Sequence, residues 1–124
     1  MIIFENILII LIAIECFYIQ WIEMVSWSTK GASIFPEPEP GFFDKTKSMA
    51  ANQGLYNGFL GAGLICSAII SDPIWKLRAS AFFLICIIIA GIFGAISVTK
   101  SIFIKQSIPS LIVLLALFVI YYLA

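Results

Sequence analysis

The chain has no histidine, and only three of its 124 residues are cysteines. Without histidine, a single chain can form neither a Cys–His catalytic pair nor a zinc site that uses imidazole. The three cysteines stand inside apolar stretches at spacings that fit no metal motif, so we interpret them as small packing residues. The sequence therefore predicts no metal site and no bound cofactor.

Charge is also scarce. Only 11% of the residues are charged, against about 25% in an ordinary soluble domain, while 62% are hydrophobic and the mean hydropathy is +1.11. Seven Lys and Arg are balanced by seven Asp and Glu, so no excess of positive charge is available to attract nucleic acid. These values exclude a soluble domain, a disordered tail and a nucleic-acid-binding protein, and they indicate the lipid bilayer as the chain's main partner.

Long uncharged runs predict membrane-spanning helices, each of which needs about 20 mostly apolar residues. Runs of 24, 21 and 19 uncharged residues cover positions 48–71, 79–99 and 106–124, and residues 2–27 are as apolar except for acidic interruptions. We expect helices over about 2–27, 47–71, 75–98 and 107–124, with Ser107 as a plausible cap of the last. Glu5 stands where a signal peptide carries positive charge, so we expect the first helix to be retained.

The predicted fold class is all-α, a four-helix transmembrane bundle with its termini on the same side. Residues 1–124 would form one integral membrane domain. The first and third loops carry five lysines, whereas the opposite side carries only Lys76 and Arg78. Because basic loops stay on the cytoplasmic side, we expect the first and third loops to be cytoplasmic.

Glu15 is the residue of the first predicted span that most strongly indicates a polar or ionisable site. It lies near the middle of the span, where a carboxyl group costs about 2.5–3.5 kcal/mol on insertion scales. At 100° per residue, Glu5 and Glu23 share one direction near the two interfaces, and Tyr18 lies on or beside that face. Glu15 is either an acid that donates a structural hydrogen bond between helices or a site for a proton, a cation or a polar ligand, and the sequence leaves both open.

The second predicted span carries a polar arc that would face Glu15. The arc consists of Asn52, Gln53, Tyr56 and Asn57. Unpaired amides in hydrocarbon cost several kcal/mol, so we expect the arc to face protein or trapped water. Gly54 and Gly58 on the opposite side allow another backbone to approach closely, and we expect a homo-oligomer, most readily a dimer, through such Gly-rich helix faces.

Three parts of the chain together resemble a known family. They are residues 13–27 (Ala13-Ile-Glu-Cys-Phe-Tyr18 to Glu23-Met-Val-Ser-Trp27), residues 46–63, and residues 90–95 followed by 106–109. The chain is similar over nearly its whole length to the small bacterial membrane proteins grouped as the domain of unknown function 1304 family. This resemblance implies a four-span protein of the bacterial plasma membrane with undetermined activity. The family pattern has a Glu-His pair where this chain has Glu15-Cys16, which puts any role of that histidine in doubt here.

The candidate ligand-binding residues combine the polar positions of the first two spans with the start of the last. They are Glu15, Tyr18, Glu23, Asn52, Gln53, Tyr56, Asn57 and Gln106. We favour a module that binds or transports a small polar solute, a proton or a cation. The alternatives are an intramembrane isomerase or epimerase-like enzyme acting on a lipid-like substrate, with Glu15 as general acid or base, and a structural membrane subunit without chemistry of its own. The sequence assigns no catalytic residue.

Overall fold

The computed structural model describes residues 2–123, and every regular element within that range is helical, which confirms the all-α prediction. The long helices are α1 (Ile2–Met24), α4 (Lys47–Ala68), α5 (Pro73–Ser97) and α7 (Ile108–Leu123). The short elements are the π-helical turns η1 (Trp27–Gly31) and η2 (Phe103–Ser107) and the helices α2 (Ala32–Ile34), α3 (Phe42–Lys45) and α6 (Lys100–Ile102).

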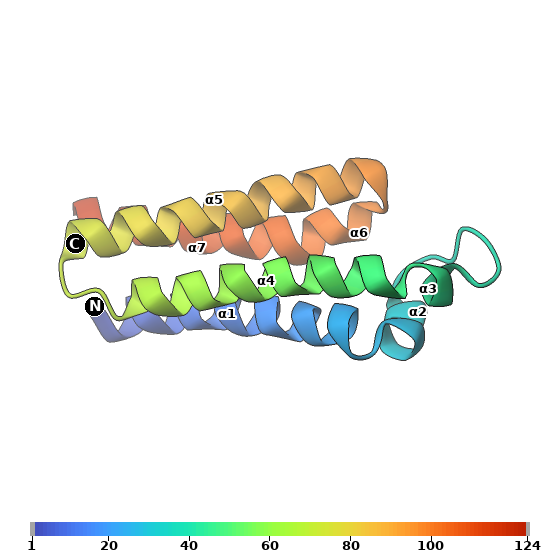
Figure 1. Cartoon of the computed structure of the whole chain (residues 1–124). Coiled ribbons are helices and arrows are strands. Elements are labelled where there is room, and N and C mark those ends of the chain that lie inside the picture. The colour runs from blue at the N-terminus through green and yellow to red at the C-terminus, as the bar shows by residue number, and fades with distance from the viewer. Residues whose placement is uncertain (1, 124) are drawn as a thin grey trace.

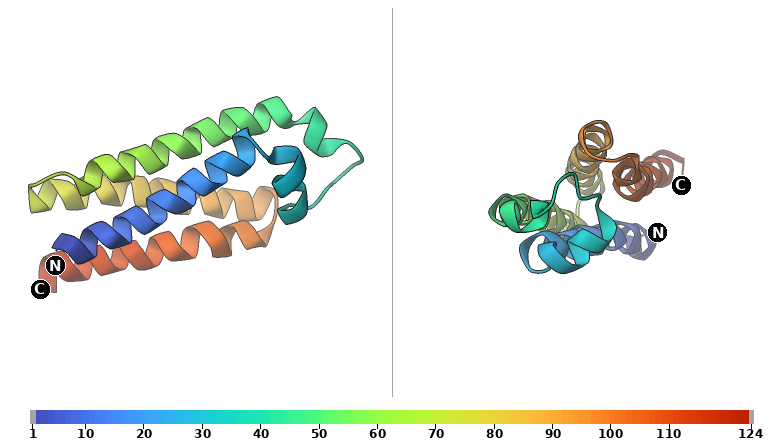
Figure 2. Two further views of the ribbon diagram at one scale, coloured as in Figure 1. Left: turned by 90° about the horizontal axis from the view of Figure 1, so that it is seen from below. Right: turned by 90° about the vertical axis from the view of Figure 1, so that its right-hand side faces the viewer.

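The four long helices lie side by side and alternate in direction (Figures 1 and 2). One end of the bundle contains the start of α1, the last residues of α7 and the turn from α4 to α5. The other end carries α2 and α3 beyond the α1–α4 pair, and α6 beyond the α5–α7 pair. The chain thus forms two helical hairpins that lie against each other.

Three helical segments are long and apolar enough to cross a membrane, namely Ile2–Met24, Pro73–Ser97 and Lys100–Leu123. α4 has a comparable length, but its amides and glycines lower its mean hydropathy, because both kinds of residue contribute little apolar surface. The composition of the helices therefore supports a membrane protein with three apolar helices, and α4 differs from the others in kind.

The helix boundaries differ from the predicted ones by a few residues. α1 ends at Met24 instead of near residue 27, because the chain enters the turn η1 there, and α4 ends at Ala68 instead of near residue 71. α5 begins at Pro73, two residues earlier than expected. The carboxylate of Asp72 accepts hydrogen bonds from the backbone N–H groups of the next turn, and proline needs no partner for its nitrogen at a helix start.

The main cluster of buried hydrophobic residues lies in one half of the bundle, which we call the closed half and define as residues 8–16, 60–68, 74–87 and 113–117. All four long helices contribute to its core cluster, and Ile9, Leu64 and Leu84 are fully buried in it. A second part of the bundle, which we call the open half, comprises residues 17–24, 47–59, 88–97 and 100–107. There, glycines allow close contacts of α1 with α4 and of α5 with η2.

Glycines bring α1 and α4 into close contact. A Cβ atom added to Gly54 would lie 2.9 Å from the Cβ of Glu23, and one added to Gly61 would lie 3.2 Å from the carbonyl oxygen of Ala13. At Gly54 a Cβ atom would force a neighbour to move, and at Gly61 it would be a tight contact, so both glycines favour close approach, as in helix pairs of other membrane proteins. This edge of α4 is therefore occupied within the chain, and self-association of the protein stays a prediction.

The α5–η2 pair also uses a glycine. A Cβ on Gly91 would collide with the hydroxyl of Ser107, which donates a hydrogen bond to the carbonyl oxygen of Ile88 at 2.9 Å. Ser107 was expected to cap the last helix, and that expectation is wrong. The chain is already helical from Lys100, so the hydroxyl is free to cross to α5.

An aromatic cluster holds the first loop over the ends of α1 and α4. The ring of Trp27 lies against Phe35 and Phe43, with centroid separations of 5.5 and 5.1 Å. Its indole Nε1–H donates a hydrogen bond to the hydroxyl of Thr46 at 2.9 Å. These contacts join the beginning and the end of a loop that the prolines between them keep extended.

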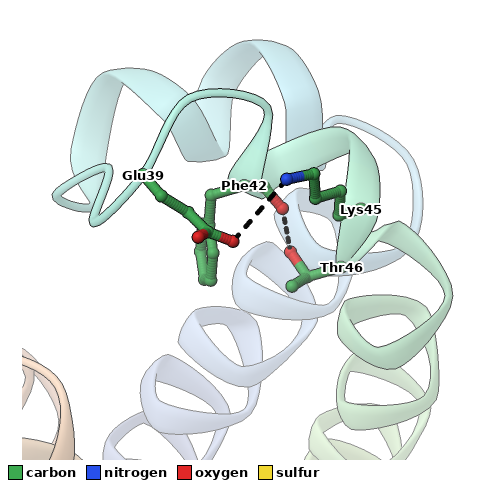
Figure 3. A network of polar contacts seen from close by, with 4 residues as sticks. All are labelled: Glu39, Phe42, Lys45 and Thr46. Carbon is green, nitrogen blue, oxygen red and sulfur yellow. Dashed lines mark hydrogen bonds and ion pairs between the residues drawn. The ribbon is translucent and has the colours of Figure 1, made fainter.

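The polar contacts of α3 close this loop from the outer side (Figure 3). The hydroxyl of Thr46 donates to the carbonyl oxygen of Phe42 at 2.7 Å, and the ammonium of Lys45 lies 3.8 Å from a carboxylate oxygen of Glu39. Both members of the ion pair are largely exposed, so it contributes little to stability. The loop is held mainly by its aromatic contacts.

Candidate functional site

The central polar contact of the open half joins Glu23 of α1 to Asn57 of α4. The side-chain amide of Asn57 donates to Oε1 of Glu23 at 2.5 Å, and only 3% of Glu23 is exposed. Within residues 2–123, the carboxyl group of Glu23 forms no other hydrogen bond and no ion pair. Glu23 is thus a buried acid with one neutral partner.

The register of the α1–α4 pair explains why Glu23 is the acid beside the amides. Gly54 faces Glu23, whereas Gly61 faces Ala13. At a rise of 1.5 Å per residue, Glu15 lies about 12 Å along α1 from Glu23, in the direction of Ala13. Glu15 is therefore level with Gly61 of α4 and not with Gly54. The predicted meeting of Glu15 with the polar arc is wrong, because close contact through the glycines fixes a different alignment.

Glu15 itself is half-buried in α1, and the structure shows no hydrogen bond from its carboxyl group to any described residue. Tyr18, the other candidate in that part of α1, is 47% exposed and stacks on Trp21 with 6.1 Å between ring centroids. Neither side chain lies in the Glu23–Asn57 contact. The acid at mid-span and the buried acid near the loop are therefore two separate features of α1.

Three residues of the polar arc are exposed. Asn52, Gln53 and Tyr56 all point away from the protein interior, and Tyr56 is 61% exposed. Tyr56 lies seven residues before Gly63, so both share one face of α4, and Gly63 contacts Phe83 of α5. Of the arc that was expected to face protein or trapped water, protein covers only Asn57, which is engaged between the helices.

Exposure of this face shows that the two helical hairpins separate in the open half. The same face of α4 packs against α5 at Gly63 but leaves Tyr56 uncovered two turns earlier. The ribbons of α4 and α5 also diverge toward the end that carries α3 and α6 (Figure 1). Gln53 and Tyr56 thus lie on the faces of α4 that, two turns further along, pack against the core at Leu60 and against α5 at Gly63.

Gln20 is a polar residue of this site that the sequence analysis did not single out. Its amide lies over Gly58 of α4 and donates to the sulfur of Met24 at 3.5 Å. The signal was available, because Gln20 precedes Glu23 by three residues and such pairs share a helix face. Gln106, in contrast, is half-buried in η2 on the other hairpin, outside the α1–α4 contact.

The chemistry of the site is that of a hydrogen-bond acceptor surrounded by neutral polar groups. A carboxylate has two oxygens with room for several donors, and Asn57 uses one position. The neighbouring amides and phenol both donate and accept, whereas the described part of the chain contains no cluster of three or more His, Cys, Asp or Glu able to hold a metal. Such a site is suited to a proton, a small cation or a donor group of a polar solute.

Comparison with known proteins gives a match over most of the chain. Residues 10–118 match the family described as "Protein of unknown function (DUF1304)". The chain belongs to this family. The DUF1304 match covers α4 and α5 completely and most of α1 and α7, and it includes every candidate site residue, Glu23 and Asn57 among them.

One relative extends the comparison to a whole protein. The chain is 30% identical over 114 residues to "Uncharacterized protein YpaA" of Lactococcus lactis subsp. lactis (strain IL1403), and the alignment covers 90% of this chain and 94% of that protein. No solved structure was found to match the chain. The comparisons therefore establish a DUF1304 protein and leave its function to be argued from the site.

Proposed function

We propose that this DUF1304 protein is a four-span plasma-membrane protein that binds a small cation, a proton or a cationic group of a polar solute at Glu23. The fourth span is α4. It packs against α1 from Gly54 to Gly61 and runs antiparallel to it, so a bilayer that contains α1 also contains α4. The polar composition of α4 is then tolerated because part of it faces α1.

The observation that carries the proposal is the burial of Glu23 without a positive partner. Taking a carboxylate out of water costs several kcal/mol, and a single amide hydrogen bond returns only part of that. Acidic residues buried in membrane proteins mark ion or proton sites more often than stabilising contacts. A bound cation or proton would neutralise Glu23 and remove this cost.

The exposed amides and the phenol provide a route to Glu23. Gln53 and Tyr56 lie on α4 within about one turn of Asn57, and both are exposed. If the first and third loops are cytoplasmic, as their lysines favour, the site lies near the cytoplasmic surface. Transport, as opposed to binding alone, would use Glu15 as a second acid about 12 Å deeper along α1.

The two alternative functions have weaker support. An epimerase requires an acid and a base on two sides of one carbon atom, and the register of α1 and α4 separates Glu15 from Tyr56, a group of the polar arc that could act as its partner. A purely structural role would require Glu23 mainly for stability, although a buried acid with one neutral partner is a poor stabilising element.

The proposal is tested by ligand-induced stabilisation of the full chain in lipid nanodiscs. Unfolding temperatures are measured at several pH values and with sodium, potassium and small amines. At about ten times its Kd, one of these ligands is expected to raise the unfolding temperature of the wild type by about 5 °C. Glu23→Gln, which keeps an acceptor for Asn57 but removes the charge, is expected to abolish this rise.

Glu37→Gln is the matched control, because it makes the same change at an exposed carboxyl group in the first loop. It should respond to the ligand as the wild type does. An equal response of Glu23→Gln and the wild type to every ligand would refute the site. Loss of stability in Glu23→Gln without any ligand response in the wild type would support the structural role.

A further inference from the structure

A second buried charge lies at the opposite end of the bundle, where α1 begins and α5 begins (Figure 1). Lys76, in the first turn of α5, is only 7% exposed. Its ammonium donates a hydrogen bond to the side-chain oxygen of Asn6 in α1 at 2.8 Å. The fold thus brings two residues 70 positions apart into a contact that holds a lysine inside the protein.

The positive charge of Lys76 has no negative partner in the described chain. No carboxylate between residues 2 and 123 lies within 4.0 Å of its nitrogen, including Glu5, which lines a small hollow with it. An ammonium group has three donors, and Asn6 accepts one hydrogen bond. A buried cation with one neutral acceptor favours an anionic ligand.

Space for such a ligand is present beside the lysine. An open hollow of about 340 Å³ lies between the start of α1 and the turn from α4 to α5. Asn6, Ser71 and Lys76 provide its polar lining, and the rest is apolar. An ion with several acceptor oxygens fits this lining, because the ammonium and the Ser71 hydroxyl are both donors.

Aromatic residues indicate the depth of this hollow in a bilayer. Trp75 is 58% exposed at the start of α5, and Tyr122 is 65% exposed near the end of α7. Exposed Trp and Tyr at the ends of spans mark the level of the lipid headgroups. The guanidinium of Arg78 lies 5.1 Å from the centre of the Trp75 ring, so a second cation stands at the same level. The most abundant anions at that level are lipid phosphates.

We propose that Lys76, Asn6 and Ser71 form a binding site for a phosphate group, either that of an anionic phospholipid or a soluble phosphate. The ammonium contributes the charge, and Asn6 holds it in place. The site is separate from Glu23, which lies at the other end of α1, and neither proposal depends on the other.

The test compares lipids around the full-length protein. Unfolding temperatures are measured in nanodiscs of phosphatidylcholine, in nanodiscs that also contain phosphatidylglycerol, and in phosphatidylcholine nanodiscs with added inorganic phosphate. For a ligand at about ten times its Kd, the wild type is expected to gain about 5 °C. Lys76→Met keeps the length of the side chain and removes its charge, so it is expected to lose this gain.

Two further variants make the result specific. Lys105→Met removes an exposed lysine at the opposite end of the bundle and should keep the gain. Lys76→Arg keeps the charge and should also keep it, so the proposal remains testable if Lys76→Met folds poorly. Native mass spectrometry of wild type and Lys76→Met gives an independent count of retained phosphatidylglycerol, which should be lower for the variant.

The arms of the experiment identify the source of the phosphate. A gain with phosphatidylglycerol alone assigns the site to a lipid headgroup, and a gain with inorganic phosphate alone assigns it to a soluble phosphate. The same gain in wild type and Lys76→Met, or no gain of the wild type in any arm, would overturn the proposal.

Discussion

The closed and open halves of the bundle are built from the same helices and pack in different ways. In the closed half all four helices share one hydrophobic core, and the buried polar residues are Ser67, Ser80 and Lys76. In the open half the carboxyl group of Glu23, the hydroxyl group of Ser107 and several glycines are buried, and the glycine contacts lie within helix pairs. A core shared by all four helices therefore forms only in the part of the bundle where every helix directs apolar side chains inward.

α4 shows where the change takes place. Gln53 and Leu60 share one face of this helix, as do Tyr56 and Gly63, because residues seven apart differ by only about 20°. Leu60 packs against the core, whereas Gln53 and Tyr56 are exposed. Because these two faces of α4 are polar in the open half, α4 does not pack against α5 there. Glycine contacts then stabilise the α1–α4 pair.

The largest difference between the halves is expected from leucine truncations. Leu84 is fully buried in the closed half, whereas Leu55 is 40% exposed in the open half. Leu84→Ala should lower the free energy of unfolding by about 2–5 kcal/mol, since it leaves a cavity among four helices. Leu55→Ala should lower it by less than about 0.5 kcal/mol. Reversible unfolding in mixed micelles measures both, and equal losses would contradict a core restricted to the closed half.

A smaller effect is expected when the glycine contact is disturbed. Gly54→Ala places a Cβ atom against the Cβ of Glu23 and the carbonyl oxygen of Gln20, so α1 and α4 must move apart. The expected loss is about 1–3 kcal/mol. Ala62→Val adds bulk to an exposed position of the same helix and should be nearly neutral. A neutral Gly54→Ala would show that the open half does not depend on close contact between these helices.

The smallest effect concerns the Glu23–Asn57 hydrogen bond. Asn57→Leu, Glu23→Leu and the double variant form a cycle whose coupling free energy is expected to be about 0.5–1.5 kcal/mol, because each single change removes the hydrogen bond. Asn52→Leu is the control, because Asn52 is exposed and should show no coupling to Glu23. Coupling of Glu23 to Asn52 as large as that to Asn57 would mean that the carboxyl group has a different partner.

Local signals predicted the helices well. Apolar runs of helical length and the low charge led to four long helices, and the all-α class is confirmed. The amide-rich start of the second helix was recognised as unusual from composition alone. These features depend on residues close together in the chain, so hydropathy and capping rules are enough to predict them.

The partners of the polar groups required the folded chain. Spacing along α1 favoured Glu15 as the acid opposite the amides, but the fit of Gly54 and Gly61 against α1 aligns Glu23 with Asn57. Periodicity gives the face of a helix and not its axial alignment with another helix, because sliding by two turns changes the angle by only about 20°.

Composition and periodicity therefore determined that this chain is helical, that it is suited to a bilayer and that one side of α4 is polar. These three properties follow from the order of neighbouring residues in the chain. Packing decided which acid is buried, that Lys76 meets Asn6 across 70 positions, and that the core stops halfway along the bundle. Those outcomes depend on how side-chain volumes on separate helices fit together, and that fit exists only once the helices are in contact.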